Sequence, residues 1–284
     1  MKKTNHQSTT TNKQNISSII RQRINPKERF YFGILFAIGL IISIFFLLSW
    51  TSILLGVVTA ANLSKPFFYL ICCIILSVLI PYLFVKLVQT LLMGMVRGNS
   101  IKVTAKQFPT VHAMIQKQSE ALGMTTPPTG YILNGNGILQ ALAFRYLRGN
   151  YVVLYSDLVA VAKKDESVLA FIIGHELAHI KLNHVSMKKN MLLFTIPILY
   201  SAYSRAREYS CDAIGQYLAP EGAEKGMLLL AAGKHLFQGI DLQEYRKNAL
   251  SDRGFATWWS ELFMTHPHLS NRLEAIHQWS KKSK

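Results

Sequence analysis

The stretch "GHELAHIKLNH" (residues 174–184) lies in the middle of the 284-residue chain and carries two histidines, His175 and His179, four positions apart. In an α-helix this spacing places both imidazoles on one face, one turn apart, where they can bind a single ion. Glu176 lies beside the first histidine. The alternative is an ordinary helix with two histidines and a glutamate on its surface. The motif indicates a metal site only if further candidate ligands follow in the sequence.

A second stretch, "SRAREYSCD" (204–212), supplies acidic residues of the kind that a metal site needs. Glu208 is the candidate third ligand, and two histidines plus one carboxylate leave a fourth position open, as in catalytic zinc sites. Asp212 follows one turn later and could accept the N–H of a ligating histidine. Zinc lowers the pKa of bound water to about 7, and Glu176 could take its proton. The alternative for Glu208 is a solvent-facing helix residue.

A third stretch, "THPHLSNRLEAI" (265–276), offers His266 and Arg272. Either side chain could donate to the oxyanion that forms when hydroxide attacks a carbonyl. The alternative is an ordinary helix start, with Ser270 as the N-cap and Arg272 in solvent. The spacing alone does not separate these interpretations.

Taken together, the three stretches resemble the HtpX-like membrane metallopeptidase family, which also includes the CAAX prenyl proteases and a mitochondrial stress protease. The resemblance covers residues 100–280 and implies a zincin-type α+β peptidase domain, mainly α with a small β-sheet. It implies one zinc ion per chain, held by His175, His179 and Glu208. By the same resemblance, Glu176 is catalytic and Asp212 supports a ligand, while His266 and Arg272 act on the substrate or transition state.

The family often carries Asn-Ala-Phe-Ala on an edge strand upstream of the first motif. This chain has Gln140, Ala141, Leu142 and Ala143 at about that distance. The resemblance implies that this strand binds the backbone of an extended peptide by β-augmentation. Gln140 keeps the amide but is one methylene longer than asparagine, which leaves a catalytic contact from it open.

Two long apolar stretches precede this region. Residues 31–58 carry no charge and residues 66–94 carry only Lys86, and both exceed the roughly 20 residues needed to cross a bilayer. The short link between them predicts a two-helix transmembrane hairpin, with a buried hairpin as the alternative. A shorter apolar stretch, 191–203, contains Pro197 and is typical of a buried, interfacial or re-entrant element.

The charge distribution supports a membrane partner and predicts an orientation. Lys and Arg number 31 against 15 Asp and Glu, giving a formal net charge of +16, which suggests an anionic partner. We find no zinc-finger spacing or RNA-binding signature, so we predict a lipid bilayer rather than nucleic acid. Basic residues flank the outer ends of the hairpin, whereas the link carries only Lys65. This bias predicts an integral protein of the cell inner membrane, with both termini and the peptidase domain on the cytoplasmic side.

We therefore predict three regions: a disordered basic tail (1–29), the transmembrane hairpin (30–95) and the metallopeptidase domain (96–284). In the domain, helices are predicted over 109–124, from Ser167, and over 202–218, 221–237 and 270–281, with short strands over 131–133, 139–144 and 151–156. The three cysteines form no disulfide framework, and Cys211 is predicted to pack in the interior. His184 is predicted to be a polar surface residue.

These patterns predict a membrane-bound zinc endopeptidase that cleaves proteins or peptides, in quality control of membrane proteins. One alternative is processing of lipid-modified C-termini. Another is a catalytically inactive membrane adaptor that keeps the fold, although the intact set of motif residues argues against it. The oligomeric state cannot be inferred from the sequence.

Overall fold

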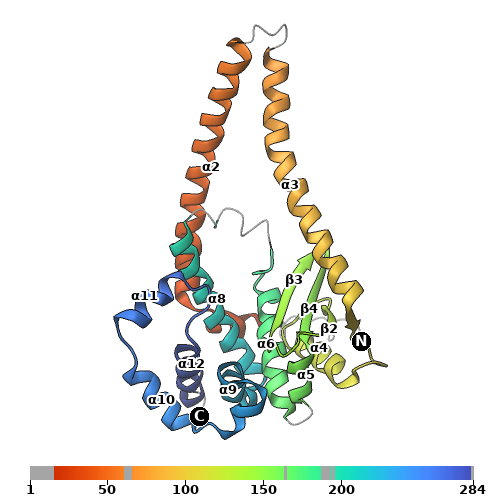
Figure 1. Ribbon diagram of the computed structural model, residues 1–284, viewed down its shortest axis with the longest axis vertical. Coiled ribbons are helices and arrows are strands. Elements are labelled where there is room, and N and C mark those ends of the chain that lie inside the picture. Colours follow the sequence, from red (N-terminus) through yellow and green to blue (C-terminus); the bar gives the residue numbers. More distant parts are fainter. Residues whose placement is uncertain (1–15, 61–65, 163–164, 187–192, 194–195, 283–284) are drawn as a thin grey trace, which may run out of the picture.

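The computed structural model describes residues 16–60, 66–162, 165–186, 193 and 196–282, and every structural statement below refers to these. A pair of long helices rises from a helical domain that contains one small sheet (Figure 1). The prediction of a mainly helical protein with a small β-sheet is therefore confirmed.

Helix α6 (Glu166–Lys181) forms the centre of the domain and packs against α4, α8, α9 and the edge of the sheet. It begins at Asp165, whose side chain caps the helix by accepting a hydrogen bond from the Ser167 amide. Its apolar side chains, including Phe171, Ile173 and Leu177, are almost fully buried. The surrounding helices are α4 (Pro109–Ala121), α5 (Ser156–Ala162), α8 (Pro197–Leu218), α9 (Pro220–Leu236), α10 (Leu242–Ser251), α11 (Phe255–Phe263) and α12 (Leu269–Lys282).

The sheet has four strands in the order β1-β2-β4-β3. The strands are β1 (Ser100–Lys102), β2 (Thr129–Leu133), β3 (Ala141–Tyr146) and β4 (Gly149–Tyr155). β2 and β4 run parallel, while β1–β2 and β3–β4 are antiparallel. Within the described residues β3 pairs with β4 alone, so it is an edge strand, as the family resemblance implied for residues 140–143, although Gln140 lies one residue before β3.

Two long helices, α2 (Pro26–Ala60) and α3 (Pro66–Asn99), contact each other and extend away from the domain (Figure 1). Among the described residues, one helix is long and apolar enough to cross a membrane, the segment Pro26–Val57 of α2. Only 11% of its most apolar stretch is buried against the rest of the protein. That α3 is a second span stays a prediction. Of the stretch 191–203, residues 197–203 form the start of α8 and four others lie outside the described residues.

The N-terminal segment differs from the predicted disordered tail. Residues 1–15 lie outside the described residues, but residues 16–23 form a helix and Pro26 begins α2. The side chains of Ile16 and Ile20, one turn apart, pack on the main core. Arg23 donates a hydrogen bond to the Ala213 carbonyl at 3.1 Å. The low hydrophobicity of the segment as a whole hid this narrow apolar face.

Helices α6 and α9 approach each other closely at Gly222, and this contact can be tested. A Cβ atom at Gly222 would lie 1.9 Å from the Ser167 carbonyl oxygen, so Gly222→Ala must push two helix backbones apart. We expect a loss of about 1–3 kcal/mol of unfolding free energy, seen as a lower thermal denaturation midpoint in detergent. Gly98→Ala is the control, because a Cβ there meets nothing within 4 Å. Equal midpoints for the two variants would contradict the contact.

Candidate metal centre

Helices α6 and α8 bring the three predicted ligands together. The Nε2 atoms of His175 and His179 lie 3.1 Å apart. The Glu208 carboxylate lies 3.4 Å from each of them, through Oε2 to His175 and through Oε1 to His179. Glu208 lies 33 residues after His175 in the sequence, and it reaches the two histidines because α8 packs against α6.

These distances fit a tetrahedral metal ion. Zinc–ligand bonds of about 2.0–2.1 Å at the tetrahedral angle place neighbouring ligand atoms about 3.3 Å apart. Here the two nitrogens lie 3.1 Å apart, and each lies 3.4 Å from a different oxygen of the Glu208 carboxylate. Two imidazole nitrogens this close, with a buried carboxylate beside them, also require a shared cation or proton to avoid repulsion. Two histidines and one carboxylate form a donor set that suits zinc.

Asp212 holds the ring of His175 from the opposite side. His175 Nδ1 lies 2.9 Å from Asp212 Oδ1, so this nitrogen can donate while Nε2 faces the metal position. Arg272 of α12 donates to both carboxylate oxygens of Asp212, through Nε at 2.8 Å and Nη2 at 2.7 Å. All three side chains are buried. The residue predicted to support a ligand therefore lies where that role requires it.

Charges in this cluster favour a cation. Burial alone lowers the pKa of His175, but hydrogen bonds to Asp212 and Glu208 and their charges outweigh it and raise the pKa to about 10. Burial raises the pKa of the Glu208 carboxyl, yet the two histidines hold it well below its ordinary value. For Asp212 the opposing effect of burial is outweighed by Arg272, which lowers the pKa. The carboxylates therefore stay ionised, and their potential at the histidines attracts positive charge.

A cavity of about 190 Å³ opens onto this cluster. It brings together residues that the sequence assigned to four separate stretches. The predicted residues that line it are Gln140, Ala141, His175, Glu176, Glu208, His266 and Arg272. Glu176 is 8% exposed and faces the same space as the ligands. The other two predicted strand residues, Leu142 and Ala143, instead line a neighbouring apolar cavity of about 720 Å³.

His266 and Arg272 differ in their surroundings. His266 is 63% exposed in its side chain and its Nε2 lies 3.7 Å from Glu208 Oε1, at the mouth of the cavity. Arg272 is 6% exposed, which excludes the alternative of a solvated arginine at a helix start. Its guanidinium, besides its bonds to Asp212, lies 3.6 Å from Glu208 Oε2. Arg272 therefore offsets the negative charge of both Asp212 and Glu208. The sequence spacing alone did not predict this buried position.

The prediction for His184 was wrong. This residue is buried, and its Nδ1 lies 3.1 Å from Nδ1 of His179. Its Nε2 lies 2.9 Å from Oε1 of Glu28, at the start of α2. The prediction assumed that the helix continued, but α6 ends at Lys181 and Asn183 adopts a left-handed backbone conformation (φ 60°), which turns His184 back toward the site. Cys211 is fully buried in the core, as expected.

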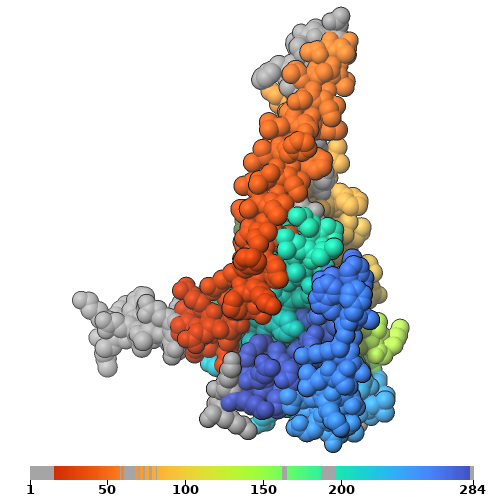
Figure 2. Space-filling model, turned by 90° about the vertical axis from the view of Figure 1, so that its left-hand side faces the viewer, coloured from red at the N-terminus to blue at the C-terminus, as the bar shows by residue number. Residues whose placement is uncertain are grey.

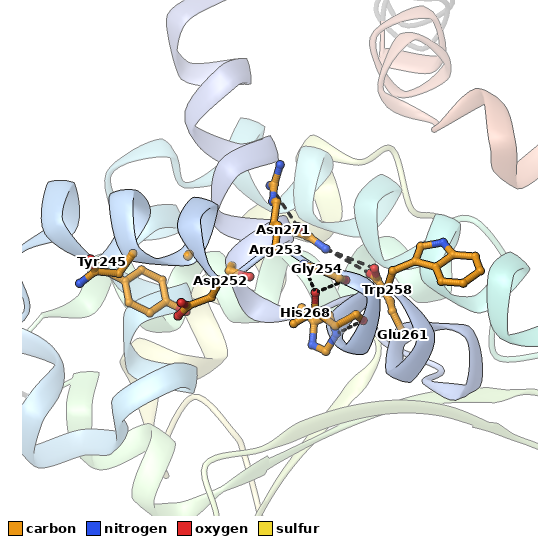
Figure 3. Close-up of a pocket in the computed structure, with 12 residues that line it drawn as sticks. Tyr245, Asp252, Arg253, Gly254, Trp258, Glu261, His268 and Asn271 are labelled. Atoms are coloured by element: carbon orange, nitrogen blue, oxygen red, sulfur yellow. Dashed lines mark hydrogen bonds between the residues drawn. The ribbon is translucent and has the colours of Figure 1, made fainter.

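Another cavity, of about 630 Å³, lies between α10, α11 and α12 (Figure 3). Its lining includes Tyr245, Arg253 and Trp258. His268 also lines it, and its Nε2–H donates a hydrogen bond to the carbonyl oxygen of Thr257 in α11 at 3.0 Å. None of the three candidate metal ligands lines this cavity, so we do not assign it to the metal centre.

A helix with the HExxH pattern, a glutamate from a second helix and an adjacent edge strand define the class of HExxH metallopeptidases. The model of peptidase family M48 matches residues 105–201 and 187–280 of the chain. Because these matches cover more than half of the sequence, the chain belongs to peptidase family M48. Comparisons with curated proteins and with solved structures gave no significant match. The resemblance is thus confirmed at the level of the family, and the HtpX-like branch within it stays a prediction.

Proposed function

We propose that this protein is a membrane-bound, zinc-dependent endopeptidase of the HtpX-like branch. The observation that carries the proposal is the convergence of His175, His179 and Glu208 at distances that suit one zinc ion, with Glu176 in the same cavity. The open side of this cluster faces the cavity next to Ala141, at the start of edge strand β3. Metal ligands, a general base and a peptide-binding edge are the parts that peptide hydrolysis needs.

Each residue has a distinct part in the proposed reaction. A bound zinc ion would polarise the scissile carbonyl and lower the pKa of the attacking water. Glu176 would take the proton of this water and pass it to the leaving amine. His266 would donate to the developing oxyanion from the mouth of the cavity. The free edge of β3 would hold the substrate backbone extended, with Gln140 and Ala141 nearest the metal.

The membrane defines the proposed substrates. Apolar helix α2 packs against α8, the helix that carries Glu208, so the site would lie close to the bilayer that α2 crosses. With the basic flanks on the cytoplasmic side of the inner membrane, the accessible substrates would be membrane proteins and their cytoplasmic ends. Quality control of such proteins fits a broad specificity for extended chains.

Two alternative functions have less support from the structure. Processing of lipid-modified C-termini would need a chamber for the lipid, built from many spans, whereas among the described residues one helix is long and apolar enough to cross a membrane. A catalytically inactive adaptor would not need a general base, yet Glu176 is present and buried beside the ligands. Both alternatives predict that the purified protein fails to cleave an unfolded soluble protein.

Metal content gives the direct test of the ligand set. We expect the full chain purified in detergent to hold near-stoichiometric zinc and to cleave casein, and a chelator to abolish cleavage until zinc is restored. Glu208→Ala removes one of three ligands and should lose most of the zinc. Glu244→Ala, an exposed carboxylate on α10, is the matched control and should keep it. Wild-type zinc content in Glu208→Ala would exclude Glu208 as a ligand, and wild-type protein without zinc would refute the proposal.

A further inference from the structure

Helix α11 presents an aromatic face that nothing in the proposed reaction uses. Its sequence, "FATWWSELF", places four aromatic side chains at positions i, i+3, i+4 and i+8, which lie on one face of a helix. Their exposed fractions are 74% for Phe255, 54% for Trp258, 51% for Trp259 and 59% for Phe263. No residue of α11 is buried. Two tryptophans and two phenylalanines exposed on nine residues form a contiguous apolar patch of the kind that marks an interaction surface.

The rings are arranged as one cluster rather than as separate side chains. The ring centroids of Phe255 and Trp259 lie 5.9 Å apart in a stacked arrangement. Trp259 and Phe263 contact edge to face at 5.8 Å, and Trp258 lies within 6.1 Å of Trp259. Because these contacts already order the side chains, little further rotamer entropy is lost when a partner covers the patch.

Contacts with α8 fix α11 at the end of the domain from which the long helices rise. Arg205 of α8 donates to the carbonyl oxygens of Glu261, Leu262 and Met264 at the C-terminal end of α11. Figures 1 and 2 both show α11, in blue, beside α8 and next to the base of α2. α11 is therefore held against the helix that packs on α2.

The level of α11 along α2 coincides with the start of the apolar stretch. Glu261 of α11 lines the same cavity as Lys27 and Tyr31 of α2. Between these two α2 residues, Arg29 is the last charged residue before the charge-free stretch begins. Basic residues followed by a tyrosine are typical of the boundary between lipid headgroups and acyl chains. The patch of α11 thus lies where this boundary would fall.

We propose that α11 is an interfacial helix whose aromatic face lies in the headgroup region of the bilayer crossed by α2. Tryptophan prefers this region because its ring is apolar and its indole N–H can bond to water or headgroups. A short amphipathic helix can lie in the plane of the interface with its apolar face inserted. Exposed Arg253, just before α11, and the net charge of +16 suit anionic phospholipids. The inference rests on the proposed membrane anchoring by α2.

Such docking has a consequence for the metal centre. The loop that carries His266 follows α11 directly, and Thr265 Oγ1 lies 3.1 Å from His266 Nδ1. The His266 side chain is 63% exposed, so its position depends on its flanking helices, α11 and α12. A helix held both by Arg205 and by the bilayer would fix the start of this loop.

Tryptophan fluorescence tests the inference because the chain contains only four tryptophans, Trp50, Trp258, Trp259 and Trp279. The full chain would be reconstituted in vesicles of phosphatidylcholine and phosphatidylglycerol, with and without lipids brominated on the acyl chains. Replacing Trp50 and Trp279 by Phe leaves the α11 pair as the emitters. Two further variants leave Trp50 alone, within α2, or Trp279 alone, on α12, where its side chain packs against the core of the domain.

We expect the α11 pair to emit at short wavelength and to lose emission in brominated vesicles, as Trp50 does, while Trp279 stays unquenched. A quenched Trp50 with an unquenched, long-wavelength α11 pair would overturn the inference and leave the anchoring intact. An unquenched Trp50 would instead remove the anchoring on which it rests. A short-wavelength but unquenched pair would also overturn it: dependence on protein density would then indicate a second copy, and dependence on added casein a substrate surface.

Discussion

Glu176→Gln is expected to bind as much zinc as the wild type and to cleave casein about 10²–10⁴-fold more slowly, the range that a positioned general base contributes. Glutamine has nearly the same shape as glutamate, so it leaves the ligand cluster undisturbed. It has no basic oxygen, however, and cannot carry a proton from the attacking water to the leaving amine. Because Glu176 lines the cavity beside His175 and Glu208, the loss should fall on turnover rather than on folding or metal content.

The matched control for this variant is Glu166→Gln. Glu166 belongs to the same helix but lies in its exposed first turn, away from the metal cavity. The substitution removes the same charge and should change the rate little. Wild-type cleavage by Glu176→Gln with zinc bound would show that another group acts as the base. If both Gln variants and the wild type bind zinc but none cleaves casein, the two alternatives, an inactive adaptor and a protease for lipid-modified C-termini, become the better interpretations.

The sequence predicted well those features that depend on local spacing. His175, Glu176 and His179 share one helix, and their relative placement follows from its 3.6-residue period. The same holds for Glu208 and Asp212 on α8. Strands were predicted over 139–144 and 151–156, and the structure extends both toward a two-residue turn, at which Leu147 adopts a left-handed conformation (φ 52°). That α6 and α8 would meet was not a matter of local spacing, and it came from the family resemblance.

Contacts between distant segments could not be predicted in the same way. Arg272 reaches Asp212 across 60 residues, so its burial could not be inferred from the start of α12. Residues 16–29 have the composition of a tail, and only the pair Ile16 and Ile20 signalled a packed face. The aromatic spacing in α11 was a readable signal of an amphipathic helix, but no pattern in it says which surface it would cover.

His184 is the clearest case of a contact that local spacing did not predict, because it links His179 of α6 to Glu28 of α2. If His179 binds zinc through Nε2, its Nδ1–H donates to Nδ1 of His184, and Nε2–H of His184 donates to Glu28. His184 must be neutral for this, and burial lowers its pKa to about 4. Ser210 donates to the other oxygen of Glu28. The candidate ligand His179 on α6 would thereby be oriented by the first turn of α2, which lies outside the segments that match the family model.

We therefore expect His184→Ala to weaken zinc binding by about 10–100-fold, the usual cost of losing a hydrogen bond to a ligating histidine. Glu28→Ala should act in the same direction, because it leaves His184 Nε2–H and the Ser210 hydroxyl without their shared buried acceptor. Glu28→Gln retains an acceptor and should recover part of the affinity. Competition with a chelator measures the dissociation constant, and thermal denaturation of the metal-free proteins shows how much of each change is general instability.

Glu224→Ala provides the comparison that distinguishes orientation of a ligand from loss of a Glu–His pair. Glu224 of α9 lies 2.8 Å from Nδ1 of His277, but neither residue lines the metal cavity. Its removal should lower stability slightly and leave zinc affinity unchanged. If it weakened zinc binding as much as His184→Ala, the effect would be one of stability alone. If His184→Ala bound zinc as the wild type does, the contact between His184 and Glu28 of α2 would not orient His179, and α6 and α8 would suffice to form the metal site.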